Sequence, residues 1–170
     1  MEKEYRVPQY VVAVQKIAPK QDVSKIIFHS GVTTIEADAF RDWKNVTDVV
    51  FEAGSRLERI QAHAFADTAL REFVAPKGLK EIGAGVFAGC KSLKFVRLNE
   101  NLEKIGGEGD GAFQNSGVEK VYMSSNLKEM AQNTFTGCAN FRKIEIVAGY
   151  GDLTMIVSAR TGSTITVNAK

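Results

Sequence analysis

A glycine-rich turn followed by a cysteine is the first feature of this sequence that could do chemistry. Residues 83–88, Gly-Ala-Gly-Val-Phe-Ala, fit the G-x-G-x-x-A pattern that wraps the pyrophosphate of a dinucleotide, and Cys90 follows two positions later. Only four residues separate Ala88 from Leu93, where a strand is expected to begin. That gap leaves no room for the crossover helix of a dinucleotide-binding fold, so the pattern predicts no cofactor site.

Carboxylates and histidines are the other candidates. Residues 106–111, GGEGDG, carry Glu108 and Asp110, but Asp110 comes one position earlier than in the calcium-binding repeat G-G-x-G-x-D, and there is no second copy. A flexible loop is favoured, and a contact at the rim of a binding surface stays open. His29 and His63 have no third ligand at zinc-like spacing and no nucleophile beside them. The sequence therefore predicts no catalytic residue, no metal site and no cofactor.

The bulk composition indicates one folded domain. The chain has 170 residues, of which 44% are hydrophobic and 25% charged, and its net charge is only +2. Without a basic block, there is no reason to expect nucleic acid as a partner. No apolar run approaches the length of a membrane span, and Glu2, Glu4 and Arg6 interrupt the N-terminal apolar residues, so neither membrane insertion nor a signal peptide is predicted.

Internal repeats determine how the chain is organised. Five segments share an Ile or Met anchor with a Phe that follows in step, and a half unit at 23–32 precedes them. The anchors are Ile35, Ile60, Ile82, Ile105 and Met130, at separations of 25, 22, 23 and 25 residues. The phenylalanines are Phe40, Phe65, Phe87, Phe113 and Phe135.

The period and the pattern resemble those of the BspA-type leucine-rich repeat, L-x-x-I-G-x-x-A-F-x-x-C-x-x-L-x-x-V-x-L. The third full unit matches that consensus at all but one position, where Val86 replaces an Ala. The matching residues are Leu79, Ile82, Gly83, Phe87, Cys90, Leu93, Val96 and Leu98. The resemblance implies an α/β leucine-rich repeat solenoid, a right-handed coil of short parallel strands with short helical or 3₁₀ turns at the Ala-Phe segments.

Comparison between the repeat units shows how to interpret Gly83 and the two cysteines, since equivalent positions in different units share one slot of the repeat. The slot of Gly83 is filled elsewhere by Glu36, Gln61, Gly106 and Ala131, so phosphate geometry does not require a glycine there. Cys90 and Cys138 share one slot two repeats apart. Parallel strands stack about 4.8 Å apart, which puts these thiols ~10 Å from each other and beyond reach of a disulfide. We expect two free thiols buried in the core.

Each unit also predicts one short strand with a buried face. The outward residues of successive strands form two rows across the sheet, which in leucine-rich repeat solenoids is the concave, ligand-binding surface. Row A comprises Lys25, Asp48, Glu72, Phe95, Lys120 and Lys143. Row B comprises Ile27, Val50, Val74, Arg97, Tyr122 and Glu145.

Row B begins with three aliphatic residues that we expect to be exposed. Flanked by Lys25, Asp48 and Glu72, they form an apolar strip with a charged rim. Phe95, Arg97 and Tyr122 together have the composition typical of interface hot spots. Strand propensity alone is an equally good explanation for exposed β-branched residues. The residues predicted to bind a protein are Ile27, Val50, Glu72, Val74, Phe95, Arg97, Lys120, Tyr122 and Glu145.

The two ends are predicted to be β-rich caps. We divide the chain into an N-terminal β cap at 1–22, a repeat array at 23–147 and a β-hairpin cap at 148–170, whose alternating runs are joined by SARTGS. An uncapped solenoid end exposes a sheet edge, so a homo-oligomer formed through the ends stays possible.

Two functional classes remain. The resemblance implies a non-catalytic protein-binding module that serves adhesion or protein recognition, with a cell-surface or secreted location. The alternative is a structural spacer or self-assembly element whose repeat array has no ligand. In the first case the partner is a protein or peptide on the concave face.

Overall fold

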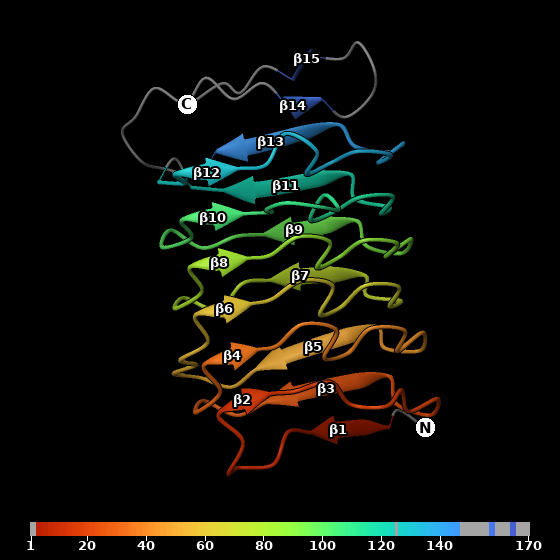
Figure 1. Cartoon of the computed structure of the whole chain (residues 1–170), viewed down its shortest axis with the longest axis vertical. Coiled ribbons are helices and arrows are strands. Elements are labelled where there is room, and N and C mark those ends of the chain that lie inside the picture. The colour runs from red at the N-terminus through yellow and green to blue at the C-terminus, as the bar shows by residue number, and fades with distance from the viewer. Residues whose placement is uncertain (1–2, 125, 147–156, 159–163, 166–170) are drawn as a thin grey trace.

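The computed structural model describes residues 3–124, 126–146, 157–158 and 164–165, and within them the chain forms a parallel β-solenoid (Figure 1). Each turn of the coil contributes one longer and one shorter strand. The longer strands are β1 (Glu4–Arg6), β3 (Lys25–Phe28), β5 (Asp48–Phe51), β7 (Glu72–Val74), β9 (Phe95–Arg97), β11 (Lys120–Met123) and β13 (Lys143–Ile146). The shorter strands are β2 (Ala13–Val14), β4 (Thr34–Ile35), β6 (Arg59–Ile60), β8 (Glu81–Ile82), β10 (Lys104–Ile105) and β12 (Glu129–Met130).

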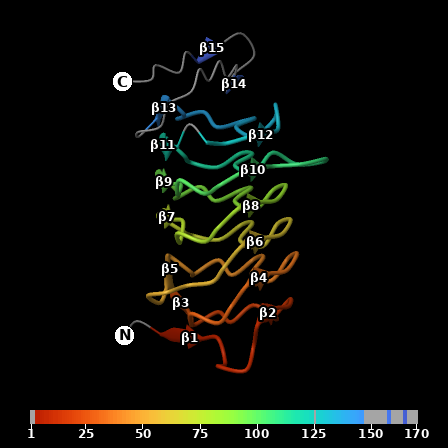
Figure 2. The same cartoon turned by 90° about the vertical axis from the view of Figure 1, so that its left-hand side faces the viewer.

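The two kinds of strand form separate parallel sheets on different sides of the coil, as Figure 2 shows from the side. The short strands pair without interruption in the order β12-β10-β8-β6-β4-β2. The long strands form two sheets, β1-β3-β5 and β7-β9-β11-β13. We call the outward side of the long strands the long-strand face. It is the surface that the sequence predicted to be concave.

The Ala-Phe segments form turns rather than the predicted helical or 3₁₀ turns, and no helix occurs in the described part of the chain. Residues four positions apart have left-handed backbone, such as Asp38 (φ 57°) with Asp42 (φ 64°) and His63 (φ 57°) with Asp67 (φ 58°). A right-handed helix cannot contain such residues. The prediction of helical turns was therefore wrong, because the repeat pattern does not show which residues adopt a left-handed backbone.

Hydrogen bonds between adjacent coils explain why these turns replace helices. The amides of Phe40, Phe65 and Phe87 donate to carbonyls one coil further on, at 2.8, 3.0 and 2.8 Å. Flanking amides do the same, so the turns form a third ladder beside the two sheets. Backbone groups satisfied between coils need no i to i−4 partner.

The core runs along the axis of the coil as a column of phenylalanine rings. Neighbouring rings of Phe40, Phe65, Phe87, Phe113 and Phe135 stack with centroids 5.6, 6.0, 5.3 and 5.3 Å apart and planes within 9° of parallel. All five side chains are buried. The column confirms the alignment of the repeats made from the sequence, because the five aligned phenylalanines follow one another in it coil by coil.

Residues from the N-terminal segment continue the coil. β1 pairs with β3 and β2 pairs with β4, both in parallel, and Val7 and Val14 are buried. At the other end β14 (Val157–Ser158) pairs antiparallel with β15 (Thr164–Ile165). The rest of the predicted hairpin cap lies outside the described residues, and the division of the chain into two caps and an array stays a prediction.

A break interrupts the long-strand sheet between β5 and β7. The amide of Arg71 donates to the Thr47 carbonyl at 3.2 Å, but no strand pairing follows. The loop after β5 is also longer than its equivalents: Ile60 lies nine positions after Phe51, whereas Ile82 lies seven after Ala75. Residues 106–111 contain another insertion, because Phe113 lies eight positions after Ile105 whereas Phe87 lies five after Ile82. The two-residue insertion after Phe51 is the one that lies at the candidate site.

Candidate functional site

In the glycine-rich turn at 83–88, the amides of Gly83, Gly85, Phe87 and Ala88 already donate to carbonyls of the protein. The Gly85 amide donates to the Asp110 carbonyl at 2.9 Å and the Phe87 amide to the Ala112 carbonyl at 2.8 Å. Phosphate-binding loops work because their amides point at the ligand. Here the amides of Gly85 and Phe87 belong to the ladder between coils, which agrees with the structural reading of this turn.

Both cysteines are free and buried, as predicted. The Cys90 thiol donates to the Phe65 carbonyl at 3.1 Å and lies 3.3 Å from the Thr68 hydroxyl, while the Cys138 thiol donates to the Phe113 carbonyl at 2.9 Å. Burial raises the pKa of Cys90 to about 11 and also raises the pKa of Cys138. Since the thiolate is the nucleophile, both thiols are poorly suited to catalysis at neutral pH.

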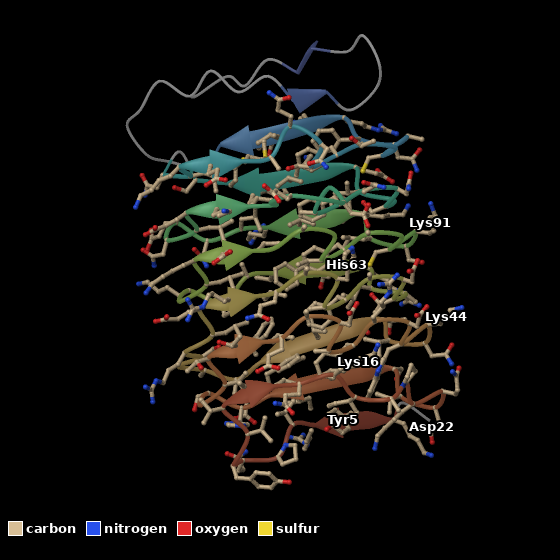
Figure 3. The ribbon with its side chains drawn as sticks, in the orientation of Figure 1. Tyr5, Lys16, Asp22, Lys44, His63 and Lys91 are labelled. Atoms are coloured by element: carbon tan, nitrogen blue, oxygen red, sulfur yellow. The ribbon has the colours of Figure 1, made fainter. Side chains whose placement is uncertain are left out.

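The two histidines have structural partners. His29 Nε2 donates to the Val11 carbonyl at 3.0 Å, and its Nδ1 accepts from the Gly31 amide at 3.1 Å. His63 Nε2 lies 2.9 Å from Asp110 Oδ2, a pair that sequence reasoning missed (Figure 3 labels His63). Asp110 belongs to the 106–111 insertion, which therefore reaches back past an intervening coil.

Among the described residues no cluster of three His, Cys, Asp or Glu side chains could hold a metal ion. The described residues also include no helix long and apolar enough to cross a membrane.

The long-strand face is where the structure brings the predicted binding residues together. Strand pairing aligns Glu72 with Phe95 in row A and Val74 with Arg97 in row B. β9 and β11 continue both rows with Lys120 beside Phe95 and Tyr122 beside Arg97. The rows derived from the repeat alignment are thus the rows of the structure, apart from the break between β5 and β7.

Three large apolar side chains on this face are exposed to solvent. Val50, Val74 and Phe95 are 39%, 54% and 48% exposed. Ile27, by contrast, is only 7% exposed, so the expectation that it continues the exposed strip was wrong. Arg6 on β1 is the register partner of Ile27, and Glu52 directly follows β5 on the other side of β3. The Arg6 guanidinium lies 3.9 Å from the Glu52 carboxylate, so this ion pair crosses over β3.

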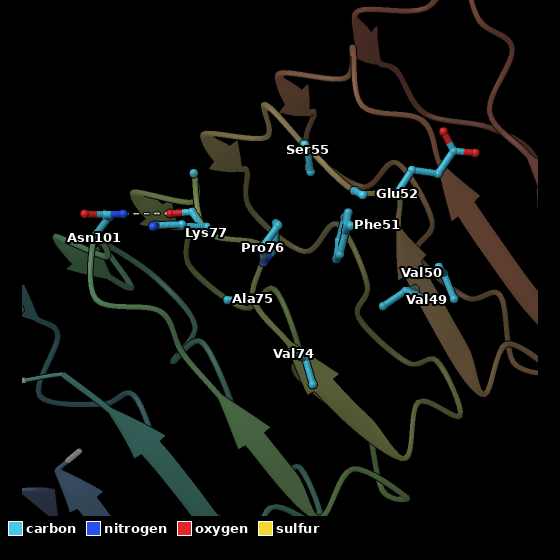
Figure 4. Close-up of a pocket in the computed structure, with 13 residues that line it drawn as sticks. Val49, Val50, Phe51, Glu52, Ser55, Val74, Ala75, Pro76, Lys77 and Asn101 are labelled. Carbon is cyan, nitrogen blue, oxygen red and sulfur yellow. Dashed lines mark hydrogen bonds between the residues drawn. The ribbon is translucent and has the colours of Figure 1, made fainter. Parts of the chain in front are cut away.

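The break between β5 and β7 opens a pocket of about 730 Å³ (Figure 4). Val50 and Val74 line it from the two strands, and the inserted loop contributes Glu52 and Gly54 (φ 75°). On the far side, the side-chain amide of Asn101 donates to the Lys77 carbonyl at 2.9 Å. Sequence reasoning missed the loop residues of this pocket, although the nine-residue spacing after Phe51 was a signal for them.

A second, smaller hollow of about 260 Å³ lies next to the first. Val74 lines both hollows and so forms the ridge between them. Glu72, Phe95, Arg97 and Tyr122 are among the other side chains around the smaller hollow. The exposed apolar residues therefore surround two adjoining depressions rather than a flat surface.

Aromatic and charged side chains border the smaller hollow on its β11 side. The Arg97 guanidinium lies 5.4 Å from the centre of the Tyr122 ring, and Lys120 Nζ donates to Tyr122 Oη at 3.1 Å. This hydrogen bond, together with the nearby Glu145 carboxylate, raises the pKa of Lys120. These contacts with Arg97 and Lys120 restrain the Tyr122 ring, which lowers the entropic cost of using it in an interface.

Comparison with protein families identifies the repeat. Six copies of the BspA type leucine rich repeat region match residues 18–142. No curated protein matches the sequence significantly.

Several solved structures share the fold. The crystal structure of the pneumococcal vaccine antigen PcpA is 23% identical, with a TM-score of 0.76 over 86% of this chain and 40% of that chain. A leucine-rich repeat protein from Eubacterium ventriosum is 25% identical, with a TM-score of 0.67 over 75% of this chain and 32% of that chain. A leucine rich cell surface protein from Faecalibacterium prausnitzii is 18% identical, with a TM-score of 0.54 over 73% of this chain and 39% of that chain.

This chain spans less than half the length of each of these three solved chains. The family match covers most of the sequence, and the stacked coils and the phenylalanine column are the structural form of the repeats that it identifies. The chain belongs to the family of BspA-type leucine-rich repeat proteins.

Proposed function

We propose that this chain is a non-catalytic protein-binding module that acts in adhesion or protein recognition through its long-strand face. The observation that carries the proposal is the clustering of Val50, Val74 and Phe95 around two adjoining hollows. Isolated apolar residues on a surface need no explanation, but a contiguous apolar patch with polar residues at its rim is typical of an interaction site.

The side chains at the rim support the same proposal. Arg97 and Tyr122 lie beside the smaller hollow, and Arg, Tyr and Trp dominate the binding energy of protein interfaces. Leucine-rich repeat solenoids present such extended surfaces as a consequence of stacking, and the repeat family typically serves as a scaffold rather than an enzyme. The buried, weakly acidic thiols fit a non-catalytic role.

A cell-surface or secreted location goes with this function. Two of the structural neighbours are described as a vaccine antigen and as a cell surface protein. We extend that location to this chain as part of the proposal.

The test is a capture experiment from host or bacterial cell extracts with the purified chain as bait. A Val74→Glu, Tyr122→Ala double variant places a charge on the ridge between the hollows and removes the ring beside it. Val12→Glu is the matched control, because Val12 is 55% exposed against 54% for Val74 and lies outside the long-strand face. Circular dichroism first establishes that both variants are folded.

A partner that the wild type and Val12→Glu retain and the double variant loses supports the proposal. Equal retention by all three proteins, or capture by none, refutes it. In that event the alternative of a spacer or self-assembly element becomes the working hypothesis, and sedimentation analysis of the chain alone tests it.

A further inference from the structure

Charges on the long-strand face differ between its ends and its centre. At the N-terminal end Lys25 lies 3.2 Å from Glu4, and at the C-terminal end Lys120 lies 3.7 Å from Glu145. Glu145 also pairs with Lys143, and that hydrogen bond is the main cause of its lowered pKa. At both ends, the charged side chains of the rows therefore have partners of opposite charge within the protein.

The centre lacks such internal pairing. Within the part of the chain that the structure describes, Asp48, Glu72 and Arg97 form no ion pair with an opposite charge. Asp48 accepts a hydrogen bond from the Thr47 hydroxyl at 2.6 Å, and Arg97 contacts the Tyr122 ring. These three charges surround the apolar side chains: Glu72 is the register partner of Phe95, and Arg97 is that of Val74.

We infer that this site accepts an extended peptide segment in which an aliphatic side chain lies between a Lys or Arg and an Asp or Glu. The inference rests on the proposed function and names its ligand. The basic side chain pairs with the carboxylates of Asp48 and Glu72, and the acidic side chain pairs with the Arg97 guanidinium. The aliphatic side chain enters the smaller hollow against Val74 and Phe95.

Sheet geometry sets the spacing of the three ligand residues. Strands stack about 4.8 Å apart and residues along a strand are about 3.3 Å apart. Glu72 and Arg97 lie on the paired strands β7 and β9, one strand spacing and two residues apart, or roughly 8 Å. An extended chain covers that distance in about two to three residues. The ligand therefore carries its opposite charges about two or three positions apart, with the basic residue on the β5 side.

Charge complementarity excludes two other kinds of ligand at this position. A phosphate backbone or an anionic membrane would meet the carboxylates of Asp48 and Glu72 before it reached Arg97. A wholly apolar segment would leave all three charges near a dehydrated interface without partners, which costs binding free energy. A peptide of mixed charge satisfies all three groups.

The test begins with selection of binders from a library of random linear peptides on the wild-type chain, in parallel with Glu72→Lys. A synthetic peptide of the enriched sequence is then titrated by fluorescence anisotropy against the wild type, Glu72→Lys and Arg97→Glu. Glu108→Lys and Arg59→Glu are matched controls, since both residues are exposed and lie outside the long-strand face. Glu72→Gln replaces Glu72→Lys if the latter does not fold.

We expect enrichment of the basic–aliphatic–acidic pattern and a loss of affinity of at least about tenfold in each charge reversal, with both controls unchanged. Selection on Glu72→Lys should enrich an acidic residue where the wild type enriches a basic one. Failure to enrich any peptide, enrichment of uncharged or uniformly charged peptides, or equal binding by the reversals overturns the inference. If a protein partner still depends on Val74 in the capture experiment, the proposed function survives that result. If neither the peptide selection nor the capture experiment gives the expected result, both the peptide inference and the proposed function are refuted.

Discussion

The phenylalanine column predicts a large difference between two chemically identical substitutions, Phe87→Ala and Phe95→Ala. Phe87 is fully buried, with ring centroids 6.0 Å from Phe65, 5.3 Å from Phe113 and 4.7 Å from Phe73. Phe95 is 48% exposed on the long-strand face. Truncating a buried Phe to Ala lowers the free energy of unfolding by about 3–5 kcal/mol, because the buried apolar surface of the ring is lost and a cavity remains in its place.

That cost is a large fraction of the total stability, since the free energy of unfolding of an ordinary domain is about 5–15 kcal/mol. With a urea m-value of about 2 kcal/mol/M, the midpoint of Phe87→Ala should fall by about 2 M. Phe95→Ala should stay within about 0.5 kcal/mol of the wild type, because an exposed ring loses little on truncation. Because most contacts of a coil are with its neighbours, the Phe87 cavity also weakens the coupling between the two halves of the array.

The assay is urea unfolding followed by two signals. Far-UV circular dichroism reports all coils, and the fluorescence of Trp43, the one tryptophan of the chain, reports the N-terminal half. In the wild type the two transitions should coincide, and in Phe87→Ala they should separate. A loss below about 1 kcal/mol for Phe87→Ala, or equal losses in the two variants, would contradict a core built on this column.

Two further predictions concern the turns and the buried thiol. Gly85 has φ 61°, and an added Cβ would clash with the His63 ring, so Gly85→Ala should lower the melting temperature. In a His63→Ala background the same change should cost only the backbone part, about 1 kcal/mol. Additive effects of the two changes would contradict the contact. Because burial raises the pKa of Cys90 to about 11, the rate of iodoacetamide labelling of the folded chain should keep rising up to that pH rather than level off near about 8.5. The stability that the protonated thiol contributes should be lost as pH rises from about 8.5 towards 11. Labelling that saturates near pH ~8.5 would show an exposed thiol.

The repeat period made much of the fold predictable from sequence. Once Ile60, Phe65 and Phe73 are aligned with their equivalents, every position inherits the environment of its slot, because stacked coils place equivalent residues one strand spacing apart. Strand register, the buried phenylalanines, the free thiols and both outward rows followed from that alignment, and the structure has them apart from the break between β5 and β7 and the burial of Ile27.

The candidate site was predictable only in its rows. Val50, Val74 and Phe95 were placed on the outward face by alternation alone. The hollows between them depend on how far apart β5 and β7 lie, and a period count does not measure that distance. The two extra residues after Phe51 could have drawn attention to the break, but the pocket that they form follows from the path of the loop.

The sequence alone determined which residues occupy equivalent positions of the repeat, since the repeat period can be read directly from the spacing of residue types along the chain. What only the tertiary structure decided depends on contacts between slots. The left-handed backbone at Asp38 and Asp42 accompanies hydrogen bonds to the next coil, and the buried Ile27 lies on a strand that is spanned by an ion pair between residues of its two neighbours. The pairing of His63 with Asp110 depends on an insertion that reaches past a whole coil. Each of these features joins residues from different turns of the solenoid, and such contacts exist only once the coils are stacked.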